Sequence, residues 1–260
     1  SLAYSLSNHG WNVKIISDPL IPQASRIAAG LLQRINHKFF TLNPLVESCF
    51  DNAIHYYHQL EKQFSVSLIQ NFPIKFLFSD YHLDIWKKKK SRSEFSSLLG
   101  QTLHHETYPN HHLSIDLYQS YAVNTGLLLD TYHAYFKKNN MMHVNTVTQN
   151  DLVFKKDFVR YHDICASYVI LCLGAQLSHW PLFQSSYFRN VKGEIITFMS
   201  SHQSSDHIVQ CDKWMIPQQK NIFKFGATYY RDVSNLPRKQ GYDELVSSLS
   251  SLIKPDYFIG

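Results

Sequence analysis

The sequence predicts an α/β fold in which a mainly antiparallel region is interleaved with a helix-and-strand unit. Residues 1–9 have the apolar spacing of a helix that ends at Gly10, and the apolar residues 11–17 (WNVKIIS) then predict a buried strand. Residues 191–228 contain four short segments typical of antiparallel strands, separated by turns. The first feature is the second half of a βαβ unit, and the second feature indicates a separate sheet.

The composition is typical of a folded protein that does not span a membrane. At 260 residues with 44% apolar and 14% aromatic residues, the chain can bury a core and is too apolar to stay disordered. The net charge of +5 says little about partners, because the basic residues are scattered apart from one lysine run. No apolar stretch approaches the roughly 18 residues of a membrane span, and the four cysteines show no close pairing. We therefore expect a soluble, cytoplasmic protein.

The remaining elements follow from periodicity and capping residues. Asn43 and Pro44 predict the start of a helix over 44–64, and Asp130 predicts the cap of a helix that ends near 138. Two further helices are expected over 81–99, with Trp86 and Leu98 inward, and over 241–253. Strands are expected at 72–78, 120–123, 142–148 and 152–154, and a polar, His-rich loop at 101–112.

The apolar run 167–173 (SYVILCL) predicts a strand that is buried on both faces and closed by Gly174. Cys165 and Cys172 lie in these apolar surroundings, which are typical of reduced core cysteines. An apolar strand raises the pKa of a thiol, so we expect Cys172 to be unreactive.

A segment of small residues, 24–31 (ASRIAAGL), follows the first strand within a few positions. Small residues let backbone amides approach a bulky anion closely. The segment resembles the one after the second strand in D-amino-acid oxidase and its relatives, where it lies along the FAD diphosphate and flavin ring. The resemblance implies cofactor contacts from Ser25, Arg26, Ala28, Ala29, Gly30 and Leu31.

Later segments resemble the same superfamily in the same order. Residues 145–148 resemble the strand whose valine backbone holds the adenine, which implies Val147 here. Residues 168–175 resemble the strand and turn that reach the cofactor, which implies contacts from Leu173, Gly174 and Ala175. Residues 191–195 resemble the strand that enters the substrate domain. Residues 213–232 resemble the hairpin over the substrate cavity, which implies that Trp214 and Tyr229 face the substrate.

The resemblance implies a Rossmann-like FAD-binding domain interleaved with a mixed or antiparallel substrate domain. The expected FAD-binding ranges are 1–65 and 139–185 with 241–260, and the expected substrate-domain ranges are 66–138 and 186–240. The implied activity is oxidation of a small amine or amino acid by hydride transfer to the flavin, with oxygen or another acceptor reoxidising it. The cofactor supplies the electron sink, and no side chain stands out as catalytic.

The sequence also departs from the family pattern. The ribose-binding carboxylate is expected at position 17, which is serine, with Asp18 one position later. The glycine-rich GxGxxG turn does not occur from residue 1 onward, and a C-terminal segment with a substrate-binding arginine does not occur before Gly260. We therefore expect the gene to encode a longer chain.

Three other interpretations remain open. The run 86–92 (WKKKKSR) would suit phosphate contacts, as in a relative that oxidises a wobble-uridine side chain in tRNA, although a solvated helix face is favoured. A flavin-free remnant of the fold with a binding role is a second alternative. Zinc is a third, weaker alternative, because the spacing of the candidate ligands matches no familiar site and favours a solvated loop; these ligands are His104, His105, Glu106, His111 and His112.

Overall fold

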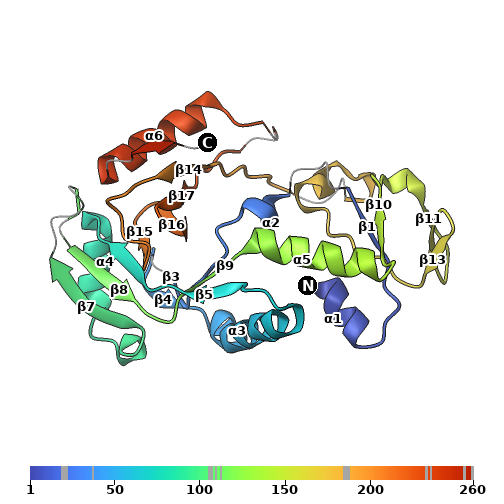
Figure 1. The fold of residues 1–260 in the computed structure, drawn as a ribbon, viewed down its shortest axis with the longest axis horizontal. Helices are drawn as coiled ribbons and strands as arrows, with labels where there is room; N and C mark the ends of the chain where they lie inside the picture. The colour runs from blue at the N-terminus through green and yellow to red at the C-terminus, as the bar shows by residue number, and fades with distance from the viewer. Residues whose placement is uncertain are drawn as a thin grey trace. The chain divides into compact units, whose positions relative to one another are not determined.

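The computed structural model divides into two compact units (Figure 1). Unit 1 comprises Ser1–Ile27, Gly126–Val191 and Arg231–Val233, and unit 2 comprises Ala28–Thr125, Lys192–Tyr230 and Ser234–Gly260. Within these ranges the structure describes residues 1–18, 23–36, 38–104, 108, 110, 111, 113–183, 188–231, 234, 236–253 and 256–258.

Unit 1 contains a parallel strand pair and a small antiparallel sheet. The parallel pair is β1 with β10, and the small sheet has the order β11-β12-β13. Tyr4 of α1 is buried against the rings of Tyr132 and Tyr135 in α5, with ring centroids 5.5 and 5.3 Å apart. The elements are α1 Leu2–Asn8, β1 Ile15–Ser17, α2 Ala24–Ile27, α5 Thr125–Lys138, β10 Met142–Val144, η2 Gln149–Asp151, β11 Leu152–Phe154, β12 Val159–Tyr161, β13 Ile164–Ala166, η3 Gly174–His179 and η4 Pro181–Phe183.

Unit 2 is built on an eight-stranded sheet with the order β18-β14-β17-β16-β15-β6-β8-β7. Its strands pair antiparallel except for β6 and β15, which run parallel. The strands are β6 Ile74–Leu77, β7 Leu99–His104, β8 Leu113–Leu117, β14 Ile195–Met199, β15 Ile208–Gln210, β16 Trp214–Gln219, β17 Ile222–Gly226 and β18 Tyr257–Phe258.

Smaller elements complete unit 2. Two short sheets have the orders β2-β9-β5 and β3-β4. The elements are β2 Leu31–Leu32, β3 Ile35–Asn36, β4 Thr41–Leu42, α3 Pro44–Phe64, β5 Ile69–Asn71, α4 Asp80–Lys89, η1 Ser93–Phe95, β9 Tyr121–Val123 and α6 Lys239–Leu252.

The large sheet of unit 2 buries both faces because its strands alternate apolar side chains. Ile208 and Ile216 belong to one core cluster, which also includes Phe40 and Trp86, the latter from α4. The next residue along β15, Val209, joins a second cluster with Leu245 and Leu249 of α6. Figure 1 shows α6 (red) along the β14 and β17 end of this sheet. The period of two in a strand therefore places the two cores on opposite faces.

The helix predicted over 44–64 is confirmed to the residue. The side chain of Asn43 accepts a hydrogen bond from the backbone N–H of Leu45 at 3.0 Å, and Pro44 occupies the first turn. Phe50 and Leu60 form its buried stripe, and the helix ends at Ser65 with a left-handed φ of 53°. Local capping and periodicity are therefore sufficient to predict these bounds.

Two predicted helix bounds are wrong. The helix predicted over 81–99 ends at Lys89 and is followed by η1, although Trp86 and Leu98 are buried as expected. The helix predicted to begin at Asp130 begins at Thr125. Asp130 lies inside α5 and pairs with Arg26 instead of capping.

The strand predicted over 167–173 is also wrong. These residues lie outside every strand and are largely exposed, with Tyr168 at 72% and Ile170 at 57% exposure. Cys165 and Cys172, predicted to be core residues, are exposed. In the described part of the chain no strand pairs with this segment, and only Leu171 and Leu173 of it pack against the cluster of Leu152, Tyr161 and Trp180. Part of the predicted loop 101–112 is strand instead, because β7 extends through His104.

The division into units groups some ranges differently from the expected domains. The structure groups 28–65 and 241–260 with the large sheet, and it groups 126–138 with the parallel pair. The expected domains were defined by the ligand each would bind, so the assignment of the FAD-binding and substrate roles stays a prediction.

Candidate functional site

In unit 1 the carboxyl ends of β1 and β10 lie next to each other. The strands are parallel with Ser17 opposite Val144, so the residues after them leave the sheet at one edge, where α/β proteins bind ligands. The hydroxyl of Thr146 donates a hydrogen bond to the carboxylate of Asp18. This contact fixes the predicted ribose-binding carboxylate beside the segment that contains Val147.

The predicted glycine turn packs on the same core cluster as Val147. Val147 and Leu173 are both half-buried against a cluster formed by Leu152, Tyr161 and Trp180. Gly174 follows with a left-handed φ of 54°, and no atom lies within 4 Å of the position that a Cβ would take. The carbonyl of Ala175 accepts a hydrogen bond from the Ser178 hydroxyl at 2.9 Å. Glycine therefore leaves open space at this turn, which suits the close approach of a ligand.

Ser25 and Arg26 lie on the short helix α2 in unit 1. Arg26 Nη1 lies 2.8 Å from Asp130 Oδ1 of α5, with side chains that are 41% and 63% exposed. Ser25 is exposed. The guanidinium of Arg26 is thus paired within unit 1.

The rest of the predicted segment, Ala28 to Leu31, belongs to unit 2 and has a structural explanation there. Gly30 has a left-handed φ of 68°, and a Cβ at this position would lie 2.0 Å from the carbonyl oxygen of Val123. The Gly30 carbonyl accepts a hydrogen bond from the Val123 backbone N–H at 2.9 Å, and Leu31 pairs with Ala122 in the β2–β9 ladder. Ala29 packs against the core. The fold therefore requires glycine at position 30 whether or not a ligand binds.

The predicted substrate residues lie on or beside the β16–β17 hairpin of unit 2. Trp214 begins β16 and is half-buried against the cluster that contains Ile216. Tyr229 follows β17 and is 71% exposed. The predicted hairpin is confirmed, since Gln219 pairs with Ile222 and the turn residue Asn221 has a φ of 64°.

Sequence analysis did not single out Glu194, a buried carboxylate directly before β14. Its Oε1 accepts a hydrogen bond from the Arg238 backbone N–H at 2.9 Å and lies 3.0 Å from Lys192 Nζ. The side chains of Lys192 and Glu194 are only 11% and 12% exposed. Gly241 makes room for this carboxylate, since a Cβ there would lie 1.6 Å from Glu194 Oε2. The signal in the sequence was a Lys and a Glu two positions apart, which share one side of an extended chain.

Glu244 ties α6 to the hairpin. Its carboxylate accepts hydrogen bonds from Lys213 Nζ at 2.7 Å and from the Tyr230 hydroxyl at 2.5 Å. These two bonds hold the pKa of Glu244 below its usual value, and the bond from Lys213 has the larger effect. The bond to Glu244 raises the pKa of Tyr230. The Arg238 guanidinium carbon lies 3.9 Å from the centre of the Tyr230 ring. These contacts fix the chain directly after Tyr229.

No protein-family model matches the sequence. Solved structures do resemble the chain. An iminodiacetate oxidase from a Chelativorans species has a TM-score of 0.75 at 14% identity, over 98% of this chain and 77% of that chain. A glycine oxidase from Bacillus cereus has a TM-score of 0.75 at 15% identity, over 98% of this chain and 78% of that chain. The L-α-glycerophosphate oxidase from Mycoplasma pneumoniae, solved with FAD bound, has a TM-score of 0.67 at 13% identity, over 96% of this chain and 74% of that chain.

The chain has the fold of these oxidases. The predicted α/β class is confirmed, as is the predicted resemblance to the D-amino-acid-oxidase-like fold. Identities of 10–15% carry the fold and do not by themselves assign an activity. The cofactor and substrate roles of individual residues therefore stay predictions on a confirmed fold.

The lysine run behind the tRNA interpretation has local contacts in this fold. Lys89 Nζ donates hydrogen bonds to the carbonyl oxygens of Phe39 and Phe40, at 2.5 and 3.2 Å. Lys87 Nζ lies 3.8 Å from Asp84 Oδ1 on the same helix. These contacts give two of the lysines a local role on α4, and a tRNA partner stays a prediction.

The His-rich segment considered for zinc is described only in part. His104 is exposed on β7, and His111 Nδ1 lies 3.0 Å from the carbonyl oxygen of Phe78. His105, Glu106 and His112 lie outside the described residues. The described residues contain no group of three side chains that could hold a metal ion. They also contain no helix long and apolar enough to cross a bilayer.

Proposed function

We propose that this chain is an FAD-dependent oxidoreductase that oxidises a small amine or amino acid by hydride transfer to the flavin. The observation that carries the proposal is the similarity in fold over 98% of the chain to oxidases of iminodiacetate and glycine. Both compounds carry an amine nitrogen and a carboxylate on a small skeleton. FAD, which is bound in the glycerophosphate oxidase structure, supplies the electron sink for such chemistry.

The nucleotide end of FAD would be held in unit 1. Asp18 would accept hydrogen bonds from ribose hydroxyls, and Thr146 orients its carboxylate for that role. Val147 would hold the adenine through its backbone, and the open space at Gly174 would let the backbone approach the cofactor closely. The residues at this edge of the parallel pair therefore fit a nucleotide.

The substrate would be positioned by unit 2. Trp214 is half-buried at the start of β16, and Tyr229 presents an exposed phenol beyond β17. An aromatic pair of this kind offers an apolar wall and a hydroxyl, which exclude water and orient a small polar substrate. The ion pair of Glu244 with Lys213 and the hydrogen bond from the Tyr230 hydroxyl to Glu244 hold this end of the hairpin in place.

Retention of FAD is the first test of the proposal. The protein is incubated with FAD, passed through a gel-filtration column and examined for the visible absorbance of oxidised flavin. We expect the wild type to retain FAD and Asp18→Asn to bind it about tenfold more weakly, since a hydrogen bond to a charged group is lost. Asp157→Asn is a matched control on an exposed carboxylate of the same unit, and it should bind FAD as the wild type does.

Loss of visible flavin absorbance without oxygen tests the substrate class. Glycine, iminodiacetate and L-proline are added anaerobically to the flavin-loaded protein, with α-glycerophosphate as a substrate without nitrogen. Loss of flavin absorbance with an amine, and not with α-glycerophosphate, supports the proposal. Bleaching by α-glycerophosphate alone would overturn the amine assignment while keeping the flavoenzyme. A wild-type protein that retains no FAD would overturn both and favour the flavin-free remnant.

A further inference from the structure

A cavity of about 380 Å³ lies in unit 2, and none of the residues predicted to hold cofactor or substrate lines it. It opens beyond the carboxyl ends of β6 and β15, the parallel pair of the large sheet, in which Phe76 lies opposite Gln210. Chains that leave parallel strands at one edge form the crevice where α/β proteins bind ligands. The cavity is lined by Lys38, Ser79, Tyr81, His82, Cys211 and Asp212.

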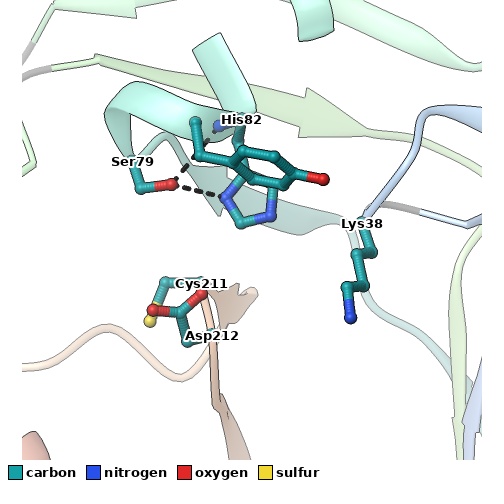
Figure 2. A pocket seen from close by; sticks show the side chains of 6 residues that line it. Lys38, Ser79, His82, Cys211 and Asp212 are labelled. Atoms are coloured by element: carbon teal, nitrogen blue, oxygen red, sulfur yellow. Dashed lines mark hydrogen bonds between the residues drawn. The ribbon is translucent and has the colours of Figure 1, made fainter. Parts of the chain in front are cut away.

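His82 presents one hydrogen-bond donor to this cavity. It is only 5% exposed, and its Nδ1 lies 2.7 Å from the Ser79 hydroxyl oxygen. Ser79 caps α4 and its oxygen accepts the His82 backbone N–H; we assign its single proton to the bond with Nδ1, which places the ring proton on Nε2. Burial lowers the pKa of His82, so the ring is neutral at neutral pH. Figure 2 shows the imidazole with Nδ1 towards Ser79 and its other nitrogen on the open side.

The cavity also carries one charge of each sign. Lys38 lowers the pKa of His82 and Asp212 raises it, so both charges act on the same ring. Lys38 and Asp212 are exposed, and neither forms an ion pair within the part of the chain that the structure describes. Burial raises the pKa of the Cys211 thiol, which therefore adds no third charge at neutral pH. In Figure 2 Asp212 lies across the open space from His82, with Lys38 at its edge.

We propose that this cavity binds a small zwitterion, such as a free amino acid, as a site separate from the predicted flavin and substrate residues. The ammonium group is held by Asp212, and the carboxylate is held by Lys38 and the Nε2–H of His82. A purely anionic ligand would meet Asp212 unfavourably, and a purely cationic ligand would leave Lys38 uncompensated. A metal ion lacks ligands here, because the described residues contain no suitable group of three. Two unpaired opposite charges beside a neutral donor therefore select a molecule that carries both charges.

Calorimetric titration with the twenty common amino acids tests the site directly. Acetate and methylamine, which each carry one of the two charges, are titrated alongside. We expect at least one amino acid to bind at least tenfold more tightly than either single-charge compound. Lys38→Met and Asp212→Asn should each weaken this binding about tenfold, as expected for one charged hydrogen bond. Both side chains are exposed, so both variants should fold.

Matched controls are Lys87→Met and Asp84→Asn, which change an exposed pair on α4 that does not line the cavity. These controls should bind as the wild type does. Amino-acid binding that survives Lys38→Met and Asp212→Asn would overturn the proposal, since it would belong to another site such as that of the substrate. Tight acetate binding that is insensitive to Asp212→Asn would also overturn it. Neither result depends on FAD, because the titration is performed with and without the cofactor.

Discussion

Two apolar segments of similar composition have opposite outcomes in this chain. Residues 72–78 (FPIKFLF) enclose β6, where Phe76 and Leu77 are fully buried, whereas residues 167–173 (SYVILCL) are largely exposed. The strand β6 has β15 on one side and β8 on the other, and both of its faces are covered. The second segment pairs with no strand in the described chain. An apolar run therefore predicts the capacity for burial, and its neighbours decide whether burial occurs.

Truncating one side chain in each segment tests this comparison. It is also the prediction with the largest expected effect. We expect Phe76→Ala to lower the free energy of unfolding by about 3–5 kcal/mol, because it leaves a cavity in a close-packed core. Ile170→Ala should change it by less than about 0.5 kcal/mol, as for an exposed side chain. Urea unfolding followed by circular dichroism measures both. An equal loss for Ile170→Ala would show that residues 167–173 are buried in the protein.

The parts of the fold that could be predicted from the sequence are those fixed by local signals. The helix α3 was predicted to the residue because Asn43, Pro44 and a continuous apolar stripe define it locally. The hairpin between β16 and β17 was also predicted, since its turn and alternation lie within a few residues. The exposure of 167–173 could not be predicted, because it depends on which strands lie beside the segment.

The same limit applies to the candidate site. A parallel pair predicts that residues after β1 and β10 meet, and Asp18 and Thr146 do meet. The contact of Glu194 with Arg238 joins positions 44 residues apart and has no local signal. The resemblance implies that Gly30 contacts the cofactor, while in the structure the position that its Cβ would take lies 2.0 Å from the Val123 carbonyl oxygen. A small residue predicts a close approach without saying to what.

Substitution of two glycines with left-handed backbone compares a packed position in unit 2 with an open position in unit 1. Gly30→Ala should cost about 2–5 kcal/mol, since the Cβ would add both backbone strain and overlap with Val123. Gly174→Ala should cost only about 1–2 kcal/mol, because strain alone remains where no atom lies within 4 Å. Unfolding midpoints in urea would reveal the difference. Equal costs would contradict the structural role assigned to Gly30.

The contacts of Glu244 predict a smaller, pH-dependent effect in unit 2. The pKa of Glu244 is lowered in the folded chain by Lys213 and Tyr230, so its ionised form stabilises the fold above the ordinary Glu pKa of about 4.3. That stability is lost as the pH falls through the lowered pKa. We expect Glu244→Gln to be less stable than the wild type by at most about 1 kcal/mol at neutral pH, since the pair is partly exposed.

The difference between Glu244→Gln and the wild type should shrink as the pH falls well below about 4.3. Urea midpoints measured across the acidic range would follow it. Tyr230→Phe serves as a control that keeps the Lys213 pair, so it should retain most of the pH dependence. A difference that stays constant with pH would assign the effect of Glu244 to packing.

A small effect on stability is also expected at Arg26 and Asp130, an exposed ion pair in unit 1. Arg26→Met and Asp130→Asn should each change the free energy of unfolding by less than about 1 kcal/mol, because exposed ion pairs contribute little. FAD affinity separates the two roles open to Arg26. If it contacts the diphosphate as predicted, Arg26→Met weakens FAD binding, whereas Asp130→Asn strengthens it by removing a competing carboxylate. Fluorescence titration of FAD would measure both shifts, and identical affinities in the three proteins would leave Arg26 with the ion pair alone.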